Sequence, residues 1–160
     1  MAYIISVVCA VILLAADQLS KAFVAANYSL YDTGTLIPRI FDFCYIRNTG
    51  GAWGVLSGKT WLLVVITVVV MAAVIWWMIK RINGNKLLFA AACLVLSGGV
   101  GNMVDRIFRG GSVVDFIQFA FWKSFPVFNI ADCAIVAGCC LLAVSLLKDG
   151  FKADKEIKEN

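Results

Sequence analysis

The chain has 160 residues, of which 62% are hydrophobic and 15% are charged, and its formal net charge is +4. Soluble domains contain about 45–50% apolar residues, so this composition excludes an ordinary soluble protein and indicates one compact membrane unit. The basic residues are spread among ends and loops, which argues against binding of nucleic acid.

Four apolar segments are each long enough to cross a bilayer, which takes about 20 helical residues. In chain order, we expect spans at about 3–24, 60–79, 87–106 and 128–147. The first span resembles a signal peptide in length, but it lacks a basic start, so we expect it to be retained. Small residues from Ser97 to Gly101 predict close contact of the third span with another helix.

The segments between the spans are unequal in length. We expect long connectors at 27–59 and 107–127, a tight turn at 80–86 and a charged tail at 148–160. Residues 39–48, "RIFDFCYIRN", alternate partly between aromatic and other residues, which predicts a short strand. The sequence therefore predicts a mainly α, single-unit membrane protein with four transmembrane helices and a little β-structure in its first connector.

Charge alone leaves the orientation of the chain open, because each side of the membrane would carry seven Lys and Arg residues. Positively charged short loops favour the cytoplasm. The compact basic turn and the basic tail therefore favour a cytoplasmic location for both termini.

Unusual polar residues gather at the ends of the predicted spans. Successive spans alternate in direction, so the end of the first, the start of the second, the end of the third and the start of the fourth share one side. The residues concerned are Asp17, Lys21, Asn48, Asn102, Asp105, Arg106, Asp115, Asn129 and Asp132. Ionisable residues near a membrane interior are candidates for function, so we expect a polar site at this side.

The chemistry of such a site is restricted, because the chain has no histidine. Ser-His and Cys-His catalysis and His-based zinc sites are therefore excluded. The six cysteines show neither zinc spacing nor a disulfide framework. Two carboxylates in a low-dielectric pocket can share one proton and activate water against a peptide bond. That reaction requires no metal and no cofactor, and we expect neither.

Four of the polar residues are expected to form ion pairs. Asp17 lies four residues before Lys21, so the two can pair on one helical face. Asp105 adjoins Arg106, which predicts a second pair. A carboxylate held by a cation is a poor general base.

The choice of dyad follows from these pairs. Asp115 and Asp132 have no adjacent cation, and we favour them as the proton-sharing pair, while Asp105 with Asp132 stays open as an alternative. Asp132 alone is also explained as the N-cap of the fourth helix. Two other functions stay open: a proton-conducting transporter, and a structural subunit of a membrane complex.

Five motifs together resemble those of the lipoprotein signal peptidases, or signal peptidase II, over nearly the whole chain. They are "DQLSK" at Asp17–Lys21, "NTGGAWG" at Asn48–Gly54, "GNMVDR" at Gly101–Arg106, "VVDF" at Val113–Phe116 and "FNIAD" at Phe128–Asp132. Trp53 stands where the family commonly has Phe.

The resemblance implies an aspartic endopeptidase of the bacterial cytoplasmic membrane. Such an enzyme cleaves diacylglyceryl-modified prolipoproteins before the lipidated cysteine, and its expected partners are this substrate and membrane lipid. The termini would be cytoplasmic, the active site would face outward, and the first connector would form a small extracytoplasmic β-cradle. We expect a monomer.

The resemblance also implies roles for individual residues. Asp115 and Asp132 match the catalytic positions. The residues expected to bind substrate or support the site are Asp17, Lys21, Asn48, Gly50, Asn102, Asp105, Arg106 and Asn129.

Overall fold

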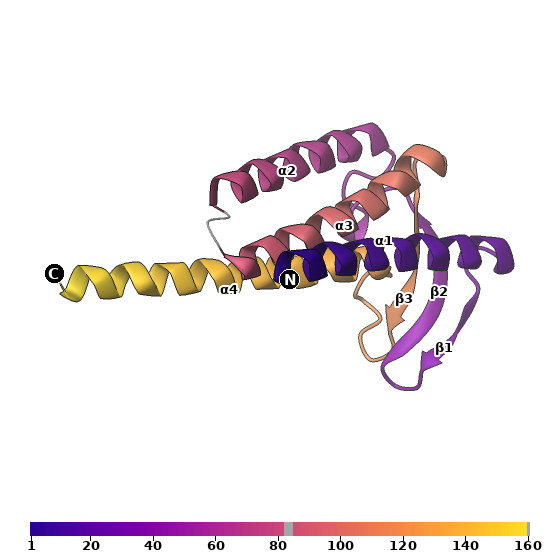
Figure 1. Cartoon of the computed structure of the whole chain (residues 1–160). Coiled ribbons are helices and arrows are strands. Elements are labelled where there is room, and N and C mark those ends of the chain that lie inside the picture. The colour runs from indigo at the N-terminus through magenta and orange to yellow at the C-terminus, as the bar shows by residue number, and fades with distance from the viewer. Residues whose placement is uncertain (82–84, 160) are drawn as a thin grey trace.

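The computed structural model describes residues 1–81 and 85–159, with side chains described through residue 80 and from 85 to 148. In chain order the elements are α1 (Ala2–Asn27), β1 (Thr33–Ile37), β2 (Phe41–Asn48), a 3-10 turn η1 (Ala52–Gly54), α2 (Thr60–Arg81), α3 (Lys86–Phe108), β3 (Val113–Phe119) and α4 (Ile130–Glu159) (Figure 1). Part of the predicted turn 80–86 lies outside the described residues. The predicted tail continues α4 to Glu159, and its side chains from residue 149 onward also lie outside them.

Four helices are long and apolar enough to cross a membrane, over Ala2–Asn27, Thr60–Lys80, Lys86–Phe108 and Ile130–Lys148. Large apolar side chains stand exposed on their outer faces, among them Val11 of α1 and Val69 of α2. Apolar patches of this extent are unfavourable in water and suit a lipid environment. The predicted fold, mainly helical with four membrane helices and a small sheet, is confirmed.

Helix α3 packs against each of the other three membrane helices (Figure 1). Its approach to α4 depends on glycine. A Cβ atom at Gly98 would lie 2.2 Å from the carbonyl oxygen of Ala131, and one at Gly138 would lie 2.8 Å from that of Ala91. The predicted close contact of the small residues in the third span is therefore confirmed.

The substitution Gly98→Ala is expected to destabilise the protein by about 2–3 kcal/mol, because its methyl group meets a backbone oxygen that can move only with the whole of α4. The measurement is thermal unfolding in detergent. Gly34→Ala is the matched control, since a Cβ there has its nearest neighbour at 3.9 Å. Equal unfolding temperatures for the two variants would show that α3 and α4 need no glycine contact.

The sheet is antiparallel, with β2 between β1 and β3. The strand predicted at residues 39–48 is confirmed as β2, whereas β1 and β3 were missed. Every residue of β1 is exposed, so no alternation reveals it. In β3 the first four residues are all buried, Asp115 among them, so its apolar run has no period of two.

The sheet lies at one end of the helical bundle (Figure 1). Phe43 and Tyr45 of β2 form a small core with Val24 of α1 and with Val114 and Phe116 of β3. This core fixes β3 beside the end of α1.

Candidate active site

The structure brings the predicted polar residues together at the sheet end of the bundle. Helix α1 supplies Asp17 and Lys21, and α3 supplies Asn102, Asp105 and Arg106. Asn48 is the last residue of β2, Gly50 follows that strand, and Asp115 lies on β3. Asn129 directly precedes α4, and Asp132 lies in its first turn. Six of them, Asn48, Gly50, Asn102, Arg106, Asp115 and Asp132, line one cavity of about 650 Å³.

The start of α4 is fixed by a reciprocal pair of hydrogen bonds. The side chain of Asn129 accepts from the backbone N–H of Asp132 at 3.0 Å, and Asp132 Oδ2 accepts from that of Asn129 at 3.1 Å. This is the capping-box arrangement, with Asn129 as the N-cap. The alternative in which Asp132 is the N-cap is therefore wrong. Oδ2 of Asp132 accepts the capping hydrogen bond, and its other oxygen faces the cavity.

Asp115 is brought to the cavity by the register of β2 and β3. Asn48 pairs with Val113, so it lies diagonally across from Asp115 on the same face of the sheet. Its amide donates to Asp115 Oδ2 at 3.0 Å, and the amide of Asn129 donates to Oδ1 at 2.6 Å. Both oxygens of this carboxylate are thus held in place.

Burial, and to a smaller extent the negative charge of Asp132, raise the pKa of Asp115 to about 7. The hydrogen bonds from Asn48 and Asn129 and the charge of Lys21 act in the opposite direction and lower this pKa. Asp115 is only 2% exposed, which explains why burial dominates. A carboxyl group with such a pKa is able to hold a proton at neutral pH.

Asp132 is held on its cavity side by the amide of Asn102, which donates to Asp132 Oδ1 at 2.7 Å. Asp115 and Asp132 therefore face one cavity, each accepting hydrogen bonds from amide groups.

In the described part of the chain, no group of three or more His, Cys, Asp or Glu side chains is placed to hold a metal ion.

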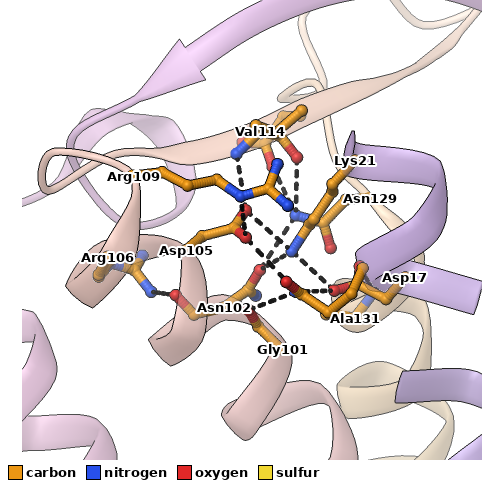
Figure 2. A network of polar contacts seen from close by, with 12 residues as sticks. Asp17, Lys21, Gly101, Asn102, Asp105, Arg106, Arg109, Val114, Asn129 and Ala131 are labelled. Carbon is orange, nitrogen blue, oxygen red and sulfur yellow. Dashed lines mark hydrogen bonds and ion pairs between the residues drawn. The ribbon is translucent and has the colours of Figure 1, made fainter. Parts of the chain in front are cut away.

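Asp105 lies behind the cavity and is not part of its lining. Its carboxylate is 3.3 Å from the ammonium of Lys21 and 3.3 Å from the guanidinium of Arg109, and it accepts from the backbone N–H of Val114 at 3.0 Å (Figure 2). Asp105 therefore joins α1, α3 and β3, and both of its oxygens are bound by residues outside the cavity lining.

The predicted ion pair between Asp105 and Arg106 is wrong. Adjacent residues on a helix point in different directions, and Arg106 instead donates to the carbonyl oxygens of Gly50 at 3.1 Å and Asn102 at 3.4 Å. The cations that pair with Asp105 are Lys21 and Arg109. Arg109 was missed, although it lies four residues after Asp105, and that spacing is the signal that could have found it.

The predicted pair of Asp17 and Lys21 is confirmed at 2.9 Å, with both side chains buried. Asp17 also accepts from the backbone N–H of Ala131 at 2.9 Å, so it satisfies a free donor in the first turn of α4. Figure 2 shows this connection between α1 and α4. The pair therefore fixes the position of the helix that carries Asp132.

The cavity continues from the two aspartates into an apolar region that the sequence analysis did not predict. Its walls are formed by Trp53, Phe119, Phe125, Pro126, Val127, Phe128, Ile135 and Val136, among others. The ring of Trp53 meets that of Phe125 edge to face at 5.8 Å.

Comparison with known proteins identifies the family to which the chain belongs. The family model of signal peptidase (SPase) II matches residues 9–148. The lipoprotein signal peptidase of Bacillus pumilus (strain SAFR-032) is 40% identical over 144 residues, which cover 89% of this chain and 92% of that protein. The lipoprotein signal peptidase of Staphylococcus aureus is 38% identical over 155 residues, covering 96% of this chain and 94% of that protein.

Two solved structures of bacterial membrane enzymes share the fold. One, solved by the in meso method at 2.3 Å resolution, superposes with a TM-score of 0.85 at 36% identity, covering 91% of this chain and 88% of the other. The second, at 1.9 Å, gives a TM-score of 0.82 at 36% identity, with 90% and 93% covered. The chain therefore belongs to the signal peptidase II family and is a multi-pass membrane protease.

Proposed function

We propose that this protein is an aspartic endopeptidase that cleaves diacylglyceryl-modified prolipoproteins immediately before the lipidated cysteine, with Asp115 and Asp132 as its catalytic pair. The observation that carries the proposal is the single cavity that contains both carboxylates. Its apolar extension along Ile135 and Val136 suits an acylated peptide. The lipoprotein signal peptidases among the relatives support the choice of substrate.

In the proposed mechanism the pair holds one proton, because two carboxylates in a dry cavity cannot both ionise easily. The ionised member takes a proton from water, whose oxygen bonds to the scissile carbonyl carbon, while the protonated member donates to the carbonyl oxygen. Collapse of the tetrahedral intermediate then breaks the C–N bond: the proton taken from water passes to the leaving amine, and a hydroxyl proton of the intermediate returns to the pair, which again holds one proton. No covalent enzyme intermediate forms.

The remaining polar residues are assigned supporting roles. Asn48, Asn102 and Asn129 donate hydrogen bonds to the two carboxylates. Arg106 and Gly50 form part of the cavity wall and are placed to meet the substrate backbone. Asp17, Lys21 and Asp105 hold the elements together from behind.

We further propose that the protein acts as a monomer in the bacterial cytoplasmic membrane, with both termini in the cytoplasm and the cavity facing outward. One chain supplies both aspartates and the amides that donate to them, so the proposed reaction requires no second copy. The end of α2, with Lys80, and the start of α3, with Lys86, lie at the end of the bundle opposite the sheet, where both termini also lie (Figure 1). A short basic loop favours the cytoplasm.

The proposal is tested by cleavage of a diacylglyceryl-modified prolipoprotein peptide by the purified chain in detergent. We expect cleavage at the bond before the modified cysteine, and much slower cleavage of the same peptide without the lipid. Absence of cleavage together with proton flux in liposomes would support the transporter instead. Against that alternative, the buried ionisable side chains among the described residues all belong to the sheet end, and only Ser97 and Ser145 are buried polar residues elsewhere.

The pH dependence follows from Asp115, whose pKa of about 7 is raised mainly by burial. A raised acid pKa means that the proton is retained below about pH 7 and lost above it. We therefore expect kcat/KM to fall above neutrality, approaching about tenfold per pH unit once the pair is fully ionised. Asn48→Ala removes a hydrogen bond that lowers this pKa, so it should move the alkaline limb to higher pH. A limb that moves to lower pH would contradict the assignment.

A further inference from the structure

Lys21 makes a contact that its ion pairs do not explain. Its buried ammonium lies 2.9 Å from Asp17 and 3.3 Å from Asp105, and it also donates to the side-chain oxygen of Asn102 at 2.9 Å (Figure 2). An ammonium has three donors and no acceptor, so these three groups occupy it fully. Lys21 does not line the cavity, so any effect on the reaction must pass through a neighbour.

That neighbour is Asn102, whose amide could in principle point either way. With its oxygen toward Lys21, its NH₂ group faces Asp132 and donates at 2.7 Å. The reversed amide would place N–H against an ammonium and an oxygen against a carboxylate. Both contacts would be repulsive in a buried site where water cannot compensate. The ammonium therefore selects the orientation that gives Asp132 a donor.

The same orientation extends to Asp115 through Asn129. The NH₂ group of Asn129 donates to the oxygen of Asn102 at 3.1 Å and to Asp115 Oδ1 at 2.6 Å. Its own oxygen accepts from the backbone N–H of Asp132. The two amides thus form a hydrogen-bonded chain that begins at the ammonium of Lys21. Its N–H groups face the carboxylates of Asp132 and Asp115.

We propose that Lys21 is a positioning residue for the peptidase reaction, whose ammonium fixes the direction of the Asn102 and Asn129 amides so that both aspartates receive N–H donors. This inference rests on the proposed function. It differs from a purely structural role, in which Lys21 only neutralises Asp17 and Asp105. The difference is measurable, because positioning through Asn102 requires Asn102 to be present.

The test is a double-mutant cycle on kcat in detergent, using the full chain and a lipidated prolipoprotein peptide. Asp17→Asn/Lys21→Met removes one positive and one negative charge together, so neither substitution leaves the partner's charge buried and unpaired. We expect it to lower kcat by about 10²-fold, similar to the loss of one preorganised donor, with KM changed less than about threefold. In an Asn102→Ala background, the same pair of substitutions should lower kcat by less than about threefold.

Ser97→Ala is the control, because it removes a buried hydrogen bond between α3 and the Ala10 carbonyl of α1 outside the cavity. We expect it to lower the unfolding temperature slightly without changing kcat. If Asp17→Asn/Lys21→Met does not fold, Asp17→Asn/Lys21→Gln takes its place in the cycle. Its amide keeps hydrogen bonding but has no charge to select one orientation of Asn102.

Equal losses of kcat with and without Asn102 would overturn the positioning role and leave Lys21 a structural ion-pair partner. A rise in KM with unchanged kcat would overturn it as well. Neither result touches the proposed function, which fails only if the unsubstituted chain does not cleave the peptide.

Discussion

Replacing either Asp115 or Asp132 by asparagine is expected to lower kcat/KM for a lipidated prolipoprotein peptide by at least about 10³-fold, within the range of general acid–base catalysis. In the proposed mechanism each member of the pair performs a step that the other cannot perform alone: one accepts a proton from water, and the other donates to the carbonyl oxygen. The double variant should be no less active than either single variant, because groups that act as a unit are not additive.

The variants must be compared in detergent, with the unfolding temperature measured beside activity. Asp42→Asn is the matched control, since it removes a carboxylate that pairs with Lys123 on the sheet, away from the cavity. We expect the control to stay within about twofold of the unsubstituted activity. Nearly full activity in Asp115→Asn, together with a folded but inactive Asp105→Asn, would instead identify Asp105 as the partner of Asp132.

The largest effect on stability is expected for Lys21→Met. The ammonium is fully buried between Asp17 and Asp105, which are themselves at most 1% exposed. Removing it leaves Asp17 buried without its cation and Asp105 with Arg109 alone, and breaking a buried pair in this way costs about 3–5 kcal/mol in proteins. The unfolding temperature in detergent should fall by roughly 10 °C.

Two further variants test whether the loss of stability in Lys21→Met comes from the broken charge pair. Lys59→Met alters an exposed lysine ahead of α2 and should change stability by less than about 0.5 kcal/mol. Asp17→Asn/Lys21→Met removes the charges together and should recover part of the loss, since Asp105 keeps Arg109 as its partner. A double variant less stable than Lys21→Met would contradict this explanation.

Much of the fold could be predicted because its signals are local. The four spans depend on the length and apolarity of continuous segments, and β2 depends on an alternation within ten residues. Strands β1 and β3 could not be predicted in this way. The former is wholly exposed, and the latter is buried throughout its first half, so neither carries a periodic pattern.

For the site, too, the features that could be predicted are those that depend on local sequence. The sequence by itself determined that the chain spans a membrane, that its chemistry must do without histidine, and that acidic and amide residues gather at one end of the spans. It also determined the pair of Asp17 and Lys21, since a spacing of four residues places two side chains on one helical face.

Only the tertiary structure decided what surrounds each carboxylate. The register of β2 and β3 puts Asn48 diagonal to Asp115, and the α4 cap turns one oxygen of Asp132 away from the cavity. Asp105 is taken by Lys21, Arg109 and the backbone of β3. These contacts join residues that are distant in the chain, and their geometry arises from packing among α1, α3, α4 and the sheet. No local spacing contains that information, because the environment that raises a pKa or orients an amide exists only once those elements meet.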